Sequence, residues 1–127
     1  MSAPFALIIE DEPKLGVIYE TVLKQAGYET EVIQRGDEAL KRLSTAAPAV
    51  ILLDLHLPYV SGVEILKVIR AIESLAKTPV IVLTADLYLA ESMEGLADYV
   101  LVKSYGVWRL REIIAQLPTT KLPSSAE

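Results

Sequence analysis

The sequence of 127 residues contains no cysteine and only one histidine. The absence of cysteine excludes a disulfide scaffold, thiolate catalysis and thiolate metal sites, and it is compatible with a reducing cytosol. One histidine is too few for a histidine zinc site. Aromatic residues make up 6% of the chain, so aliphatic side chains must fill most of the core.

Basic clusters and long apolar segments are also missing. The 12 Lys and Arg are outnumbered by 17 Asp and Glu, which gives a net charge of −5, and no run of Lys or Arg occurs. Direct binding to nucleic acid through a basic surface is therefore not expected. The longest apolar runs, such as residues 49–53, are far too short to cross a bilayer, and the start lacks a signal-peptide pattern. We expect a soluble, cytoplasmic protein with no membrane partner.

The chain does contain short apolar runs that alternate with helical stretches. Its length suits one domain, and 52% apolar residues can supply a core. The runs of strand length cover residues 5–9, 28–33, 49–54, 79–84 and 99–102. This alternation predicts βαβ units and a parallel sheet. The second run mixes charged and apolar residues, so it is predicted to be an edge strand.

Helical periodicity is clearest between the first two runs. Apolar residues recur at helical spacing from Leu15 to Ala26, with Pro13 near the start and Gly27 just after the end. Further helices are expected over residues 37–43, 65–72, 86–94 and 107–117. Residues 118–127 have little to bury, so we expect one domain over residues 1–117 followed by a flexible C-terminal tail.

Polar side chains stand at the carboxyl ends of four predicted strands. In an open parallel sheet, ligands bind beyond these ends, where the strand order reverses. In a doubly wound α/β sheet of order 2-1-3-4-5, with helices on both faces, Glu10 and Asp11 after the first strand meet Asp54 of the third. Thr84 and Lys103 end the fourth and fifth strands. The sequence therefore predicts a site at this edge.

Three neighbouring carboxylates predict a cation site. Their mutual repulsion raises the pKa of at least one of them unless a cation enters, and Mg²⁺ suits one or two carboxylates combined with phosphate oxygens. A carboxylate beside Mg²⁺ can act as a nucleophile toward a phosphoryl group, with an ammonium and a hydroxyl nearby to neutralise and bind the transferred oxygens. Any one of these residues alone is better explained as solvated surface or a loop cap, but agreement at four strand ends favours a site.

The chain resembles the receiver domain of two-component response regulators over residues 5–117. The resemblance rests on the segments LIIEDE at residues 7–12, LDLHLP at residues 53–58 with Ser61 and Gly62, LTA at residues 83–85, and Lys103. It implies a flavodoxin-like fold and a signalling domain rather than an enzyme. Asp54 would accept phosphate from a histidine kinase or phosphotransfer protein.

The resemblance also implies a magnesium site. Asp11 and Asp54 would bind Mg²⁺ directly, the backbone carbonyl of His56 would be a further ligand, and Glu10 would act through water.

The remaining implied roles concern the phosphoryl group. Lys103 would pair with its oxygens, and Thr84 would turn its hydroxyl toward it as the switch. The side chains of His56 and Asp86 would lie opposite one another beside the phosphate and tune dephosphorylation. The alternative for His56 is a solvent-exposed side chain whose backbone alone contributes.

Three features depart from the family pattern. Ser104 follows Lys103, where family members usually have proline in a cis peptide. The usual switch aromatic, three residues before the lysine, is replaced by Val100, and Tyr99 beside it points to the other face. Thr84 and Lys103 are 19 positions apart, fewer than is usual, so the fourth helix should be short or irregular.

Several alternatives remain open at this point. The departures favour a receiver-like interaction module with impaired switching, and a magnesium-dependent phosphohydrolase would differ by multiple turnover on an external substrate. A flavin phosphate would be repelled by the acidic residues 10–12, and the chain has no P-loop motif. We expect output by contact with a downstream protein through the fourth helix, Tyr99, Tyr105 and Trp108, or through a phosphorylation-linked homodimer. Residues 118–127 are either a native end or a cut linker to an output domain.

Overall fold

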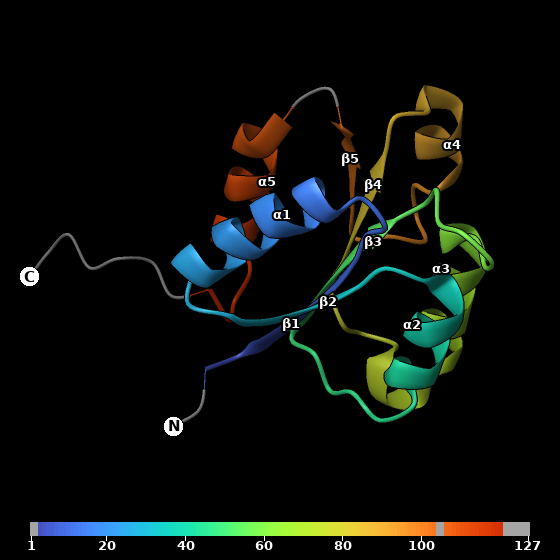
Figure 1. The fold of residues 1–127 in the computed structure, drawn as a ribbon, viewed down its shortest axis with the longest axis horizontal. Coiled ribbons are helices and arrows are strands. Elements are labelled where there is room, and N and C mark those ends of the chain that lie inside the picture. Colours follow the sequence, from blue (N-terminus) through green and yellow to red (C-terminus); the bar gives the residue numbers. More distant parts are fainter. Residues whose placement is uncertain (1–2, 104–105, 121–127) are drawn as a thin grey trace, which may run out of the picture.

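The computed structural model describes residues 3–103 and 106–120. Within them, β-strands and helices alternate along the chain (Figure 1). The elements are β1 (Phe5–Ile9), α1 (Pro13–Gln25), β2 (Glu29–Ile33), α2 (Gly36–Leu43), β3 (Val50–Asp54), α3 (Gly62–Ala71), the 3-10 helix η1 (Glu73–Leu75), β4 (Val80–Thr84), α4 (Leu87–Ser92), β5 (Tyr99–Val102) and α5 (Gly106–Ala115).

The strands form one parallel sheet of order β2-β1-β3-β4-β5, as the sequence predicted. Every residue of β3 and β4 is buried, because helices cover both faces of these strands. β2 lies at the edge and is mostly half-buried, which confirms its assignment as an edge strand.

Two apolar cores hold the three layers together. Figure 1 shows α1 and α5 on one face of the sheet and α2, α3 and α4 on the other. Side chains alternate between the two faces along each strand, so Ile8 and Leu52 enter the α1/α5 core, whereas Leu7 and Leu53 enter the α2/α3 core. The carboxyl ends of all strands therefore meet at one edge of a rigid sheet.

The departures seen in the sequence have structural counterparts. α4 has only six residues, which confirms the prediction of a short fourth helix. Val100 packs against the α2/α3 core and Tyr99 against the α1/α5 core, so the two side chains lie on opposite faces as predicted. The peptide bond to Ser104 lies outside the described residues.

The predicted partner surface stays a prediction, and the structure shows where two of its residues lie. Trp108 is 80% exposed, but it lines a hollow with Val17, Ile18 and Thr21 of α1. α4 and α5 lie on opposite faces of the sheet, and both contact the edge strand β5, which carries Tyr99 (Figure 1). The direction of the Trp108 side chain depends on how α5 is rotated about its axis. Apolar spacing in the sequence does not define this for exposed residues. Tyr105 lies outside the described residues.

The chain after α5 turns back onto the sheet. The hydroxyl oxygen of Tyr28, just before β2, lies 2.7 Å from Thr119 Oγ1 and 2.9 Å from Thr120 Oγ1. The first residues of the expected tail are therefore hydrogen-bonded to the domain, and residues 121–127 lie outside the described part. The division at residue 117 stays a prediction. In the described ranges, no helix combines the length and apolar character needed to cross a membrane.

Candidate functional site

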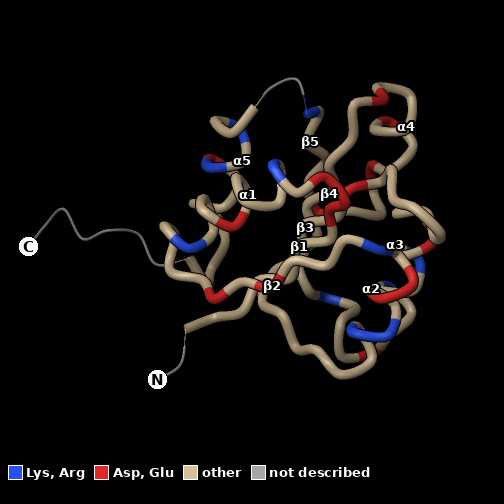
Figure 2. The backbone as a smooth tube through the Cα atoms, viewed as in Figure 1, with Lys and Arg blue, Asp and Glu red and all other residues tan. Residues whose placement is uncertain are grey.

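Three carboxylates meet where β1 and β3 end. Glu10 and Asp11 directly follow β1, and Asp54 is the last residue of β3. One oxygen of each of the three carboxylates lies within 4.8 Å of the others, as the strand order predicted. Glu10 and Asp54 are buried, whereas Asp11 is exposed. Figure 2 shows this acidic cluster at the carboxyl edge of the sheet.

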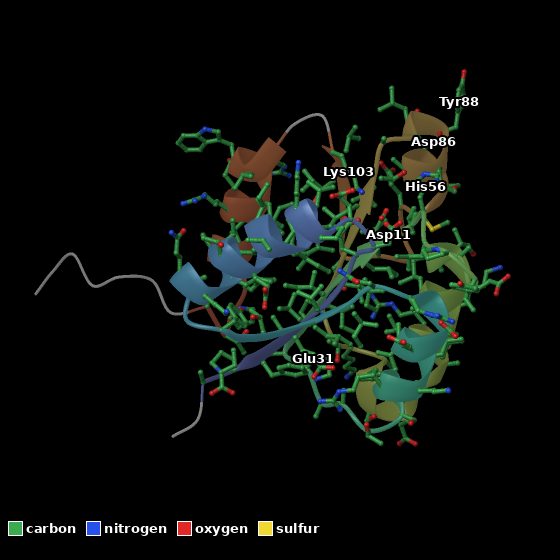
Figure 3. All side chains as sticks on the ribbon, viewed as in Figure 1. Asp11, Glu31, His56, Asp86, Tyr88 and Lys103 are labelled. Atoms are coloured by element: carbon green, nitrogen blue, oxygen red, sulfur yellow. The ribbon has the colours of Figure 1, made fainter. Side chains whose placement is uncertain are left out.

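Lys103 reaches the same cluster from the end of β5. Its Nζ lies 3.2 Å from Glu10 Oε1 and 3.3 Å from Asp54 Oδ2. The sequence placed Lys103 near Asp54, but it did not indicate the contact with Glu10. Figure 3 shows Lys103 and Asp11 at the same edge of the sheet. One ammonium group therefore partly balances two buried carboxyl groups.

Burial changes the acidity of Glu10. Burial, the hydrogen bond to Asp54 and the negative charge of Asp54 raise the pKa of Glu10 to about 7, against the lowering effects of the Glu12 N–H and Lys103. This confirms the prediction that at least one carboxyl group of the cluster has a raised pKa. Glu10 Oε2 accepts a hydrogen bond from Glu12 N at 3.2 Å. Glu10 Oε1 is buried, with Lys103 Nζ as its charged neighbour.

These residues fit a hard divalent cation. The donor set consists of carboxylate oxygens, which are the ligands Mg²⁺ prefers, and the exposed Asp11 leaves room for the waters that Mg²⁺ retains. Glu10 Oε1 is a buried oxygen that lies 3.2 Å from Lys103 Nζ. The burial of Glu10 beside Asp54 suits the water-mediated role that the resemblance implies.

On the phosphate side of the predicted site, hydrogen bonds link Asp54, His56, Thr84 and Asp86. Asp54 Oδ1 accepts from the backbone N–H of His56 at 3.0 Å, and the His56 ring Nε2 lies 3.3 Å from Thr84 Oγ1. Thr84 Oγ1 also accepts from the backbone N–H of Asp86 at 3.0 Å. His56 is exposed, and both its ring and the Asp86 backbone N–H contact Thr84 Oγ1. Residue spacing does not indicate the contact between His56 and Thr84.

Asp86 has a second role that the sequence did not predict. Its Oδ1 accepts from the backbone N–H groups of Tyr88 and Leu89, at 3.0 and 3.1 Å, and so caps the first turn of α4. Capping satisfies two backbone donors that have no partner within the helix. Asp86 therefore links Thr84, through its backbone N–H, to the start of α4, through its side chain.

The loop after β3 is fixed by close packing. A Cβ atom on Gly62 would lie 2.4 Å from the carbonyl oxygen of Asp54, so only glycine fits. Ser61 caps α3 by accepting from Glu64 N at 3.3 Å. Tyr59 has a positive φ of 73°, and the Arg35 guanidinium lies 4.1 Å from the centre of its ring. These contacts hold the segment that carries the His56 carbonyl.

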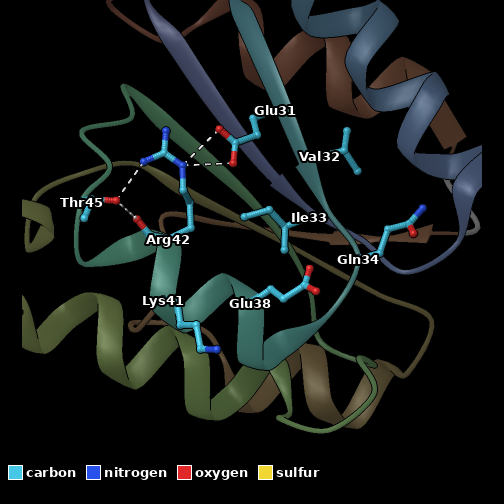
Figure 4. Close-up of a pocket in the computed structure, with 8 residues that line it drawn as sticks. All are labelled: Glu31, Val32, Ile33, Gln34, Glu38, Lys41, Arg42 and Thr45. Atoms are coloured by element: carbon cyan, nitrogen blue, oxygen red, sulfur yellow. Dashed lines mark hydrogen bonds and ion pairs between the residues drawn. The ribbon is translucent and has the colours of Figure 1, made fainter.

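A separate hollow lies between β2 and α2 (Figure 4). Inside it, Arg42 Nε donates to both carboxylate oxygens of Glu31, at 3.1 and 3.0 Å, and Arg42 Nη1 donates to Thr45 Oγ1 at 3.1 Å. The charges of Arg42 and Glu31 are thus paired with one another, and none of the predicted site residues lines this hollow.

Comparison with known proteins identifies the family. The family model for the response regulator receiver domain matches residues 6–115. The chain is 39% identical over 101 residues to the phosphate regulon transcriptional regulatory protein PhoB of Rhizobium meliloti, covering 76% of this chain and 44% of that protein. It is 34% identical over 121 residues to the transcriptional regulatory protein BaeR of Escherichia coli, covering 93% of this chain and 48% of that protein.

The structural comparison agrees. The response regulator TrrA of Thermotoga maritima, solved in complex with Mg²⁺-BeF, is 29% identical, with a TM-score of 0.80 and coverage of 90% of this chain and 98% of that one. The chain belongs to the response regulator receiver domain family, so it is a signalling domain of two-component systems. It spans about half the length of the curated relatives it matches.

Proposed function

We propose that Asp54 accepts a phosphoryl group from a histidine kinase or phosphotransfer protein in a reaction that needs Mg²⁺. The observation that carries this proposal is the position of Lys103 Nζ, 3.3 Å from Asp54 Oδ2. A fixed ammonium group beside a buried carboxylate can pair with phosphoryl oxygens as they arrive. Asp11 and Asp54, with the backbone carbonyl of His56, would hold the metal, and Glu10 would act through water.

The transfer is a displacement at phosphorus. A carboxylate oxygen of Asp54 forms a bond to phosphorus while the bond from phosphorus to the donor's imidazole nitrogen breaks, and the imidazole leaves with the electron pair. Mg²⁺, when bound, would offset the negative charge on the transferred phosphoryl oxygens. The His56 N–H holds Asp54 Oδ1 in place. Lys103 pairs with the phosphoryl oxygens, and Thr84 turns its hydroxyl toward them.

The acyl phosphate is a signal and not a turnover intermediate on an external substrate, so we propose a switch and not an enzyme. The side chains of His56 and Asp86 flank the path of the attacking water and set the lifetime of the acyl phosphate. Output passes to a downstream protein, or to a second phosphorylated copy of the chain. The relatives named above are transcriptional regulators, so we propose that such an output serves gene regulation.

Intact mass after incubation with acetyl phosphate tests this proposal. We expect one added phosphate in the presence of Mg²⁺ and none in Asp54→Asn, in Asp11→Asn or with EDTA. After removal of the donor, His56→Ala and Asp86→Ala should lose phosphate at rates that differ from wild type. An Asp54→Asn protein that is phosphorylated as fully as wild type would contradict the assignment.

Two observations favour a second candidate, an interaction module with impaired switching. Val100 replaces the usual switch aromatic and is packed against the α2/α3 core, and α4 has only six residues. In that case the wild-type mass would stay unchanged with acetyl phosphate and Mg²⁺.

A further inference from the structure

Thr84 is held by two groups outside the acidic cluster. Its side chain is fully buried, and its Oγ1 lies 3.3 Å from His56 Nε2 and 3.0 Å from the Asp86 backbone nitrogen. Within the described residues, the contacts of Asp54 are different ones: Oδ1 accepts from His56 N, and Oδ2 lies beside Lys103 Nζ. The hydroxyl of Thr84 is thus directed to His56 and Asp86.

A threonine hydroxyl has one proton and two lone pairs. The Asp86 N–H uses one lone pair, and the His56 ring nitrogen uses either the proton or the other lone pair, depending on its tautomer. In both cases the ring fixes the orientation of the Thr84 side chain. A phosphoryl group on Asp54 that recruits this hydroxyl must draw it away from the ring.

We propose that His56 is a positioning residue that restrains Thr84 in its resting orientation and so opposes the phosphorylated state. This inference rests on the proposed function and names a regulatory role for one residue of that site. His56 suits this role because it contacts both sides: its backbone N–H holds Asp54, and its ring holds Thr84. A change at Asp54 can therefore alter the position of His56, which also holds the Thr84 hydroxyl.

The restraint extends to α4. When Thr84 Oγ1 moves, the bond from the Asp86 backbone N–H is broken as well, and Asp86 is the residue that caps α4. The exposed residues Leu87 and Tyr88 form the first turn of this helix. A chain of hydrogen bonds from His56 through Thr84 to Asp86 thus links the site to α4, in a protein that has Val100 where an aromatic switch is usual.

The size of the effect follows from one neutral hydrogen bond, which shifts an equilibrium by about 3- to 10-fold. The probe is beryllium fluoride, titrated into Mg²⁺-saturated protein and followed by NMR at the backbone amides of Asp86 and Tyr88. His56→Phe keeps a ring but has no nitrogen, and we expect it to bind beryllium fluoride about 3- to 10-fold more tightly than wild type. His56→Ala should bind beryllium fluoride more tightly by a similar factor. This second variant guards against a disturbance of the loop by the phenylalanine ring.

Thr84→Val provides the matched control. It removes the hydroxyl, so His56→Phe should have no further effect on affinity in the Thr84→Val background. Before any ligand is added, the Asp86 amide signal of the His56 variants should already be displaced toward its position in the bound wild type. This displacement would not arise from a change in global stability alone.

Three outcomes would overturn the restraint. Equal affinities in wild type and both His56 variants would overturn it while leaving phosphorylation of Asp54 intact. A gain in affinity of the same size in the Thr84→Val background would show that His56 acts by another route. A wild-type protein that neither binds beryllium fluoride nor gains phosphate would overturn the restraint together with the proposed function.

Discussion

Glu10 is a carboxyl group that the fold buries completely. It lies next to Asp54 and 3.2 Å from Lys103, and its pKa is raised from an ordinary value of 4.5 to about 7, mainly by burial. The folded protein therefore favours the neutral form of Glu10, whereas the unfolded chain ionises it at its ordinary pKa. A buried acid of this kind weakens the metal-free fold at neutral pH, and a bound cation would relieve that cost.

This difference gives a pH dependence with a definite sign. Between about pH 4.5 and pH 7, the folded state holds a proton that the unfolded state has lost, so the free energy of unfolding falls as pH rises through this window. We expect Glu10→Gln to remove this contribution and to gain stability relative to wild type as pH rises. Urea unfolding of both proteins in EDTA, from about pH 5 to about pH 8, measures it.

Glu91→Gln, at an exposed position, is the control and should give a curve parallel to that of wild type. Parallel curves for wild type and Glu10→Gln would refute the raised pKa.

The turn between β3 and α3 determines the geometry of the site at the scale of an element. A Cβ atom on Gly62 would lie 2.4 Å from the Asp54 carbonyl oxygen and 2.5 Å from Leu55 Cα, and these backbone atoms cannot rotate away. On Gly16 in α1, a Cβ atom would lie 3.2 Å from Val32 Cγ1, which belongs to a side chain. The two glycines therefore differ in how much the fold depends on them.

We expect Gly62→Ala to lower the free energy of unfolding by about 2 kcal/mol or more, because a methyl group forces β3 and α3 apart. Gly16→Ala should stay within about 1 kcal/mol of wild type, because the gain in helix propensity offsets the tight contact with Val32. Urea unfolding measures both differences. The prediction fails if Gly62→Ala is as stable as Gly16→Ala.

The sequence predicted the strands well because most of them are short apolar runs, and β3 and β4 are buried at every residue. β1 and β5 begin and end at the predicted residues. It did not predict η1, or the bonds of Arg70 in α3, which donates to the Leu96 carbonyl at 2.9 Å and to Asp98 Oδ2 at 2.8 Å. Residues this far apart in sequence meet only because of how α3 packs beside the loop before β5. Apolar periodicity indicates which face of a helix is buried, and it says nothing about the partners of its polar side chains.

The site shows the same limit. Glu10, Asp54 and Lys103 were predicted to meet because parallel strands end at one edge, and the structure brings them together. The bond from His56 to Thr84 depends on the rotamer of a side chain in a loop, which residue spacing does not define. The family model confirms the class of domain, while the roles of the individual residues stay proposals.

At the scale of the whole molecule, the charge balance bears on output. The chain has 17 acidic and 12 basic residues, so its long-range field repels a polyanion. We expect the 127-residue chain by itself to show no salt-dependent affinity for duplex DNA, because its net charge is −5 and its sequence contains no run of Lys or Arg that could displace the counterions of DNA.

Fluorescence anisotropy of a labelled duplex measures this affinity. A salt concentration of about 50 mM is suitable, because electrostatic binding to DNA is stronger at low salt. Binding that weakens steadily with added salt would contradict the prediction. A basic DNA-binding protein in the same buffer provides the positive control.

The hydrogen bonds of Tyr28 with Thr119 and Thr120 have a mechanical consequence. Tyr28 stands where β2 begins, so these bonds fasten the chain after α5 to the end of the sheet opposite Asp54. A strand of five residues is about 17 Å long. In a longer protein, a segment after Thr120 would leave the domain from that far end. A pulling force on this segment would act on the hydrogen bonds of Tyr28 and not on the edge of the sheet that carries Asp54.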